Sequence, residues 1–393
     1  MSESYVSSAA LHDLPLWKKM RGKRALISLD LEITARCNNN CRHCYINLPA
    51  GDKEAKKKEL SLEEIREIGN EAVSLGAVWC LITGGEPLLR DDFPDIYLCL
   101  KKKGLLISVF TNATLVTKEH VKLFKNYPPR DIEVSVYGVS KESYEVITRR
   151  AGSFATFRQG LDLLLGSGLN VRLKAMALRS NIYEQPEIAR FCRERTKDYF
   201  RFDPFLHLRY DKDPSRNAEI KAERLSPEEI IALEQSDPER FQALKKGCDK
   251  LINPQFSHPS CKHLFHCGAG SDSFSLSDDG LFRLCSSLWH PDCVYDLKQG
   301  TLTDAWQGFI PRVRAMQSER REFLETCRKC PLINLCMWCP AHTSLETGEM
   351  DAPVDYFCQV AHARADALKT KEGSNIGLLN GSKSAGHKEK NMI

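Results

Sequence analysis

Residues 37–45 read Cys37-Asn-Asn-Asn-Cys41-Arg-His-Cys44-Tyr45, so that three cysteines occupy eight positions with the spacing CxxxCxxC. An apolar, alternating run over residues 25–33 comes directly before them and predicts a buried strand. The three thiols therefore lie on a loop at the end of a strand. Three thiolates leave one iron of a four-iron cluster without a protein ligand, and a reactive ligand can bind at that iron.

Two other interpretations of these cysteines are weaker. Structural zinc prefers four closed ligands in paired CxxC-like motifs, and no fourth cysteine lies nearby in the sequence. Three ordinary core cysteines in one polar loop are uncommon in a chain from a reducing compartment.

A second motif, Thr83-Gly84-Gly85-Glu86-Pro87, ends another apolar run over residues 77–82. Together the two motifs resemble those of the radical S-adenosylmethionine (SAM) enzymes. The resemblance implies that Cys37, Cys41 and Cys44 bind a 4Fe-4S cluster and that His43 lies against the adenine of SAM. It also implies that the turn formed by Gly84, Gly85, Glu86 and Pro87 contacts the SAM amino group.

Strand-like and helix-like segments alternate through the first half of the chain. Strands are predicted at 25–33, 77–82, 105–110, 132–137, 170–178 and 199–208, and helices at 62–75, 93–103, from about 117, at 154–165 and at 185–195. Residues 51–59 are predicted to be a charged linker. This alternation predicts an α/β fold, a partial (β/α)6 TIM-like barrel with loops gathered at the carboxyl ends of its strands, and the resemblance implies the same architecture.

Residues that end strands are candidates for contacts with SAM. They are Glu86, Asn112, Ser135 and either Lys174 or Met176. The resemblance favours Ser135 as a contact of the SAM ribose. Arg149 and Arg150 are candidates for a bidentate pair with the SAM carboxylate, or are simply part of a solvated face.

The C-terminal part of the chain is rich in cysteine. Eight thiols suffice for two more four-iron clusters, and their spacing resembles the SPASM extension of radical SAM maturases. The resemblance assigns Cys261, Cys267, Cys285 and Cys339 to a nearer auxiliary cluster, and Cys327, Cys330, Cys336 and Cys358 to a farther one. Only Met337 and Trp338 separate Cys336 from Cys339, where relatives have three residues, and this departure puts Cys339 in question. A zinc ribbon is the alternative for this part. We interpret Cys80, Cys99, Cys192, Cys248 and Cys293 as core or surface residues.

These segments predict five parts. We expect an N-terminal lead-in at 1–24, the barrel at 25–208, a bridging segment at 209–254, the SPASM domain at 255–368 and a disordered tail at 369–393. Within the bridge, Leu225-Ser-Pro-Glu-Glu predicts a helix start with a proline in its first turn.

The overall composition gives no reason to expect nucleic-acid or membrane binding. The 56 basic and 52 acidic residues leave a formal charge of only +4, and no apolar run reaches the roughly 20 residues that span a bilayer. The N-terminus lacks the apolar core of a secretory signal, so we expect a cytoplasmic protein. Its 16 cysteines are then read as metal ligands or free thiols rather than disulfides.

The resemblance implies an enzyme that cleaves SAM to a 5′-deoxyadenosyl radical and removes a hydrogen atom from a substrate, with a donor such as flavodoxin or ferredoxin supplying electrons. Most relatives with a SPASM domain modify ribosomally made peptides or proteins by crosslinking, epimerisation or oxidation, so a peptide or protein substrate is expected. A small metabolite or cofactor precursor is the alternative substrate, and a non-catalytic zinc-binding interaction protein is the alternative of another class.

The catalytic base is not identified by any motif. Sulfatase-maturing relatives place an acidic residue directly after the cysteine that matches Cys285, whereas Ser286 stands there in this chain. This departure argues against sulfatase maturation. Asp203, His207, Asp278 and Asp279 are the candidates for the base.

Overall fold

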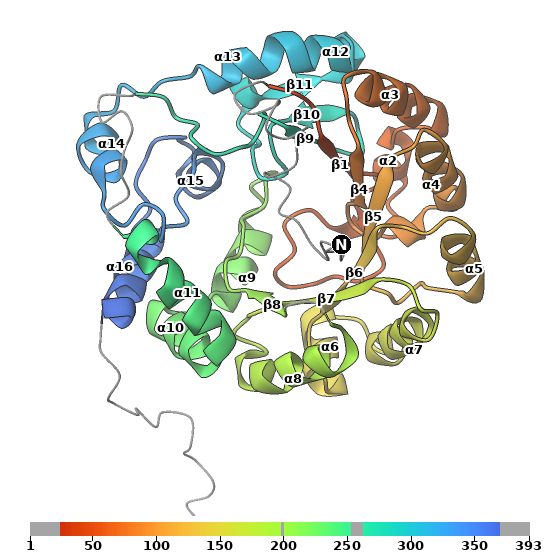
Figure 1. Cartoon of the computed structure of the whole chain (residues 1–393), viewed down its shortest axis with the longest axis horizontal. Coiled ribbons are helices and arrows are strands. Elements are labelled where there is room, and N and C mark those ends of the chain that lie inside the picture. The colour runs from red at the N-terminus through yellow and green to blue at the C-terminus, as the bar shows by residue number, and fades with distance from the viewer. Residues whose placement is uncertain (1–23, 198–199, 253–261, 370–393) are drawn as a thin grey trace, which may run out of the picture.

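The protein is described by a computed structural model that covers residues 24–197, 200–252 and 262–369. A nine-stranded sheet with the order β11-β10-β9-β1-β4-β5-β6-β7-β8 forms its centre. Strands β1 and β4 to β8 are parallel to one another and curve into part of a barrel (Figure 1). The α/β partial barrel expected from the sequence is therefore confirmed. Its strands are β1 (Ser28–Glu32), β4 (Trp79–Thr83), β5 (Leu106–Thr111), β6 (Asp131–Val136), β7 (Val171–Met176) and β8 (Arg201–Asp203).

Helices connect successive strands and cover the outer face of the curved sheet, as the right-handed crossovers of a parallel sheet require (Figure 1). They are α3 (Leu62–Ser74), α4 (Phe93–Lys102), α5 (Lys118–Asn126), α6 (Lys141–Thr148), α7 (Ser153–Leu165) and α8 (Gln185–Arg195). Helix α3, predicted at 62–75, begins at a capping box in which Ser61 and Glu64 each accept a hydrogen bond from the other's backbone N–H. Helix α6 was not predicted.

The prediction of a linker at 51–59 is wrong, because helix α2 (Lys53–Lys58) forms there. Asp52 caps this helix by accepting hydrogen bonds from the backbone N–H groups of Glu54 and Ala55. Only Ala55 of the helix is buried, so the segment lacks the apolar periodicity by which a helix is normally recognised.

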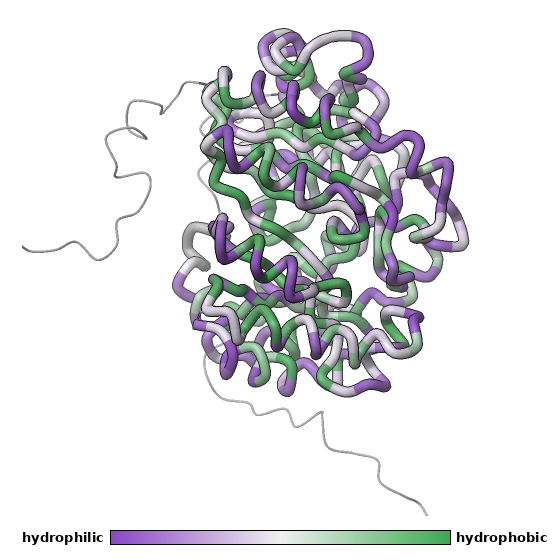
Figure 2. The backbone as a smooth tube through the Cα atoms, turned by 90° about the vertical axis from the view of Figure 1, so that its right-hand side faces the viewer, coloured by the Kyte–Doolittle hydropathy of each residue, from purple (hydrophilic) through white to green (hydrophobic). Residues whose placement is uncertain are grey.

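The core lies between the strands and their covering helices. Leu29 and Leu31 of β1 and Ile107 and Val109 of β5 are fully buried. Hydrophobic stretches of the chain concentrate inside the body, and hydrophilic stretches lie on its outer turns (Figure 2). The alternate residues of the strands face the barrel interior, where the site described below is formed.

Three helices follow the barrel: α9 (Pro214–Glu223), α10 (Pro227–Ser236) and α11 (Pro238–Leu251). Helix α10 begins with Pro227 in its first turn and has a capping box between Ser226 and Glu229, so the predicted helix start is confirmed.

The C-terminal part of the chain joins the barrel's own sheet, which the sequence did not predict. Strand β9 (Ser273–Leu276) pairs in parallel with β1, and β10 (Leu281–Arg283) and β11 (Val294–Asp296) extend the sheet in antiparallel fashion. Arg283 of β10 forms a buried ion pair with Glu32 of β1, at 2.7 Å.

The remaining elements are short strands, helices and turns. The strands are β2 (Arg36–Cys37) and β3 (Leu48–Pro49), and the helices are α12 (Leu302–Asp304), α13 (Ile310–Arg314), α14 (Arg321–Glu325), α15 (Pro340–Thr347) and α16 (Asp355–Lys369). The turns are the π-helical η6 (Ala305–Phe309) and the 3-10 turns η2 (Pro87–Leu89), η3 (Ile182–Glu184), η4 (Pro291–Cys293), η5 (Leu297–Gln299) and η7 (Cys327–Lys329).

Several predictions fall outside the described residues. These are most of the N-terminal lead-in, at 1–23, the end of the bridge with Cys261, at 253–261, and the tail from residue 370. Among the helices that the structure describes, none is both long and apolar enough to cross a lipid bilayer.

Candidate functional site

The loop that carries Cys37, Cys41 and Cys44 is fixed at several points. Strands β2 and β3 pair with each other and close its two ends. The backbone N–H groups of Asn40 and Arg42 donate to the carbonyl oxygens of Thr148 and Ile147, at 2.9 and 3.1 Å, at the end of helix α6. The loop is therefore held against the barrel by its backbone.

All three thiols line a chamber of about 400 Å3 inside the barrel. Burial raises the pKa of the Cys37 thiol to about 12, and the carboxyl of Glu86 adds to this shift. Burial also raises the pKa of Cys41 well above its usual value, and the neighbouring Cys44 and Cys37 contribute. Thiols with raised pKa values are poor ligands until a metal cation stabilises the thiolate form.

The Gly84-Gly85 turn packs directly on the chain that follows β1. A Cβ atom on Gly84, whose φ is +131°, would lie 2.2 Å from the carbonyl oxygen of Thr34, and one on Gly85 would lie 2.2 Å from that of Arg36. No side chain fits at either position, so both residues must be glycine. The turn is thereby held beside the cysteine loop, and both glycines line the chamber.

Glu86 is completely buried behind this turn. Its carboxylate accepts hydrogen bonds from the Thr111 hydroxyl at 2.8 Å and from the backbone N–H groups of Asn112 and Leu88 at 2.7 and 3.1 Å. Burial raises its pKa to about 7, against the lowering effect of these bonds. Neither Glu86 nor Pro87 lines the chamber itself.

The other predicted SAM contacts divide into two groups. His43, Asn112 and Ser135 line the chamber, as do Lys174 and Met176. Arg149 and Arg150 do not: Arg149 pairs with Glu219 at 2.7 Å, and a guanidinium nitrogen of Arg150 lies 3.5 Å from the Thr114 hydroxyl.

Of the four candidate bases, the structure brings Asp203 and His207 to the chamber and leaves Asp278 and Asp279 outside its lining. Asp278 and Asp279 lie in the turn between β9 and β10. Burial lowers the pKa of His207 to about 3, and nearby His342 and Lys174 add to the shift, so the imidazole is neutral at ordinary pH. Asp203 accepts a hydrogen bond from the backbone N–H of Phe205 at 3.0 Å.

The chamber also contains residues that the sequence analysis missed. Asp30 and Glu32 of β1, Glu133 of β6 and Tyr45 of the loop all line it, as do Asn39 and Ser287. Ser286, noted above only as a departure from sulfatase-maturing relatives, lines it too. A signal for the acidic residues was present, because Leu29-Asp30-Leu31-Glu32 places carboxylates alternately in an otherwise apolar strand. Such residues face the inside of a barrel when its interior is polar.

Unpartnered polar atoms provide a test of whether the site fits a bound group. Within the described residues, the side-chain amide of Asn39 and Nδ1 of His43 are buried without a hydrogen-bond partner. Buried polar groups normally have partners, so a ligand that supplies them is expected here. The three thiols and these atoms together fit a cluster with SAM beside it.

Seven of the eight C-terminal cysteines lie within the described residues, and thiols assigned to the same set influence one another's pKa. Burial raises the pKa of Cys285 to about 11, with further contributions from Cys339 and Cys267, so these three thiols are neighbours. Burial likewise raises the pKa of Cys336 to about 11, with contributions from Cys358, Cys327 and Cys330. Cys339 lies with the first set despite its shortened spacing. Within the described parts of the chain, no three Cys, His, Asp or Glu side chains converge as ligands of one metal ion.

Comparison with known proteins agrees with this geometry. The profile of the Radical SAM superfamily matches residues 31–192. The Fe-coproporphyrin III synthase of Methanosarcina barkeri is 30% identical over 331 residues, which cover 77% of this chain and 80% of that protein. The antilisterial bacteriocin subtilosin biosynthesis protein AlbA of Bacillus subtilis is 27% identical over 325 residues, which cover 78% of this chain and 66% of AlbA.

A solved structure shows the same fold. Streptococcus suis SuiB bound to its precursor peptide SuiA superposes with a TM-score of 0.65 at 16% identity, over 87% of this chain and 78% of that one. The chain belongs to the radical SAM superfamily. It is therefore an enzyme whose cofactors are a 4Fe-4S cluster and SAM, and the residues described above are those available to hold them.

Proposed function

We propose that this enzyme modifies a ribosomally made peptide or protein. When bound, the first cluster supplies the electron that splits SAM into methionine and a 5′-deoxyadenosyl radical, which takes a hydrogen atom from the substrate. We assign the ligation of that cluster to Cys37, Cys41 and Cys44. We propose that SAM is bound in the chamber by His43, Gly84, Gly85, Asn112 and Ser135. Glu86, Pro87 and Arg150, which do not line the chamber, are proposed to hold these residues in position.

The size of the chamber is the observation that carries the proposal. About 400 Å3 is near the lower end of the volume that a single drug-sized ligand fills, and SAM is a ligand of that size. SAM and the cluster together take up a chamber of this volume, so most of a large substrate stays outside it. The names of AlbA and of the SuiB complex point to peptide substrates for those two proteins.

The C-terminal lobe, which we define as residues 255–368, is proposed to bind two auxiliary 4Fe-4S clusters. The two sets of neighbouring thiols support this assignment, with Cys339 in the nearer set. We further propose that flavodoxin or ferredoxin reduces the enzyme and that the enzyme is cytoplasmic, because thiol ligands must remain reduced until the clusters form.

Asp203 is proposed as the proton acceptor in preference to His207. Both residues line the chamber, but Nδ1 of His207 already shares a hydrogen bond with the Ser287 hydroxyl at 3.0 Å. Asp203→Asn keeps the shape of the side chain and removes its basicity. With this variant we expect 5′-deoxyadenosine to form while modified peptide does not accumulate.

The decisive experiment uses anaerobically reconstituted enzyme, SAM, a reductant and the precursor peptide encoded beside the gene. We expect 5′-deoxyadenosine together with a change in peptide mass. Formation of 5′-deoxyadenosine without any change in the peptide would contradict the peptide proposal.

A tetrapyrrole substrate is the second candidate, because of the similarity to Fe-coproporphyrin III synthase over 80% of that protein. Parallel incubation with iron coproporphyrin III separates the two.

A further inference from the structure

Two segments of the chain meet where the barrel is open. The parallel strands end at β8, which is one edge of the sheet, and β10 lies near the other edge. Residues 205–210, which follow β8, face residues 286–289, which follow β10. We call the line along which these two segments touch the seam.

The inner end of the seam is a hydrogen bond between His207 and Ser287. Nδ1 of His207 and the Ser287 hydroxyl are 3.0 Å apart, and both residues line the chamber. The bond joins two uncharged groups, because burial keeps the imidazole neutral. Such bonds are weaker than those in which one partner is charged.

The outer end of the seam is an aromatic stack. The ring of Tyr210 lies on that of Trp289 with 3.9 Å between centroids and an angle of 14°, and the guanidinium of Arg283 covers the other face of Trp289 at 3.5 Å. Tyr210 is 37% exposed. The seam therefore runs from the protein surface to the chamber.

The backbone on both sides of the seam is tied to other parts of the protein. Arg209 binds Asp211 at 2.6 Å and the carbonyl oxygen of Asn47 at 3.2 Å. Arg283 donates to the carbonyl oxygen of Ser286 at 2.9 Å. Among the described residues, no backbone hydrogen bond joins 205–210 to 286–289. The two segments are therefore held together across the seam by side-chain contacts, while the backbone of each is attached to other parts of the protein.

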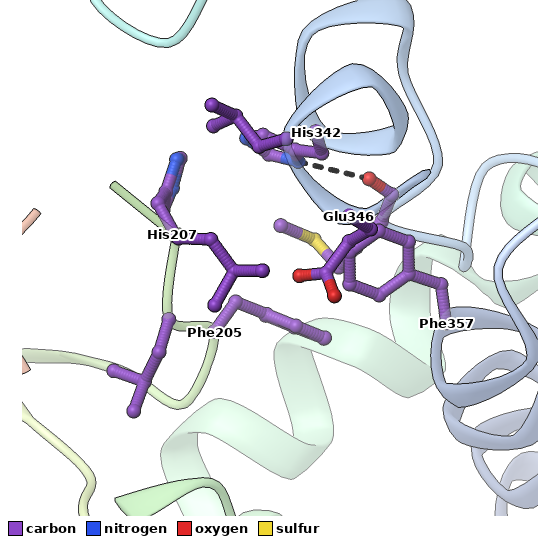
Figure 3. Close-up of a pocket in the computed structure, with 9 residues that line it drawn as sticks. Phe205, His207, His342, Glu346 and Phe357 are labelled. Atoms are coloured by element: carbon purple, nitrogen blue, oxygen red, sulfur yellow. Dashed lines mark hydrogen bonds between the residues drawn. The ribbon is translucent and has the colours of Figure 1, made fainter. Parts of the chain in front are cut away.

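A small cavity lies on the far side of His207. It is lined by Phe205, His207, His342, Glu346 and Phe357, among others, and Figure 3 shows His207 and His342 near one end of it. The two imidazole rings meet edge to face, with 4.2 Å between centroids. This cavity measures only about 10 Å3, which is at most the space of one water molecule, so the His207 ring is packed on this side.

We infer that the seam is the route by which ligands reach the chamber. The Tyr210–Trp289 stack is its outer closure, and the His207–Ser287 bond is its inner closure. SAM exchanges through it, and an extended peptide places one side chain through it. The peptide part rests on the proposed function, whereas the SAM part needs only membership of the superfamily.

The test measures how fast SAM enters and leaves the reconstituted holoenzyme, by rapid mixing and by chasing labelled SAM with unlabelled SAM. Opening a closure speeds entry and exit equally, so Tyr210→Ala should raise both rate constants by roughly 3- to 10-fold and leave Kd unchanged. Trp289→Ala should do the same. Tyr210→Phe keeps the stack and should match the wild type, as should Tyr183→Ala, which alters an 82% exposed tyrosine elsewhere.

Unchanged rate constants in the two alanine variants would overturn the inference. So would a weaker Kd that comes only from faster dissociation, because the residues would then be part of the binding site rather than of its entrance. Using both Tyr210→Ala and Trp289→Ala guards against a variant that fails to fold. Failure of the peptide proposal leaves these results intact, since no peptide is present in the measurement.

Discussion

The loop of Cys37, Cys41 and Cys44 and the cysteine-rich segment at 327–339 are held in place by different means. The first is attached to the barrel by a strand pair and by backbone hydrogen bonds to helix α6. The second lies between two short helices, α14 and α15, and consists largely of turns, with Leu332 and Leu335 packed in a small cluster of their own. A folded barrel can thus present the first thiols before any metal binds, whereas the second segment depends more on what its thiols bind.

The largest effect is expected from Cys41→Ala. This change removes one of the three proposed ligands of the SAM-binding cluster, so reductive formation of 5′-deoxyadenosine should fall to background. The barrel core does not depend on this thiol, so thermal unfolding should shift little. A circular-dichroism melt beside the product assay checks both points, and a collapsed melting curve would contradict the idea of a preformed loop.

Cys336→Ser tests the other region. It should remove one auxiliary cluster, leaving about eight of roughly twelve irons per chain, and it should destabilise the C-terminal lobe. Iron analysis and limited proteolysis measure the two effects. Cys99→Ser is the matched control, because Cys99 belongs to neither thiol set; equal iron contents in the two variants would speak against the assignment.

The buried ion pair between Arg283 of β10 and Glu32 of β1 joins the C-terminal strands to the barrel. Arg283→Met leaves the carboxylate of Glu32 buried without its partner, which should lower the free energy of unfolding by about 3–5 kcal/mol. Urea denaturation measures the change. Combining it with Glu32→Leu should recover most of the loss, and a double variant as unstable as the single one would show that packing of Arg283 matters more than charge.

Asp278, in the turn between β9 and β10, should have a smaller and pH-dependent effect on the free energy of unfolding. Burial and the neighbouring Asp279 raise its pKa to about 7, against 3.8 when unfolded. The folded state therefore prefers the protonated carboxyl, so this group's favourable contribution is complete below about pH 4 and is lost as pH rises toward 7. Asp278→Asn should stabilise the protein at pH 8 by roughly 1–3 kcal/mol relative to pH 4. Denaturation at both pH values checks this, and an unchanged difference would show that Asp278 is not the group responsible.

The smallest effect is expected at the exposed N-cap of helix α3. Ser61→Ala removes the N-cap of helix α3 and should cost about 1 kcal/mol of unfolding free energy. SAM cleavage and iron content should stay at wild-type values. A loss of iron in this variant would mean that the barrel and the clusters are more tightly coupled than the comparison above implies.

Much of the barrel could be predicted from local sequence. Alternation identified β1, the capping box at Ser61 and the proline after Ser226 marked helix starts, and the Gly84-Gly85 turn was placed by its position after an apolar run. These features depend on neighbouring residues alone. Helix α2 was missed because its capping residue precedes a charged segment with a single buried alanine. Helix α6 was missed although its N-cap, Ser140, is a residue type that commonly begins a helix.

The chamber and the seam could not be predicted because they depend on residues far apart in the chain. His207 meets Ser287, and Tyr210 meets Trp289, only when β8 and β10 are placed at their positions in the folded sheet. The same applies to β9, whose pairing with β1 joins residues about 245 positions apart, such as Asp30 and Ser275. The assignment of the candidate site residues as ligands or as a base remains a prediction for the experiments above.

The pairing of β1 with β9 has a consequence for biosynthesis. One side of the first strand has no partner until the ribosome has made residues 273–276, so an exposed strand edge persists through most of translation. Contacts this distant in sequence also slow folding. Expression at reduced temperature, or with chaperones that shield nascent chains, should therefore increase the yield of correctly assembled enzyme more than it does for a barrel whose first strand pairs only with its neighbours in sequence.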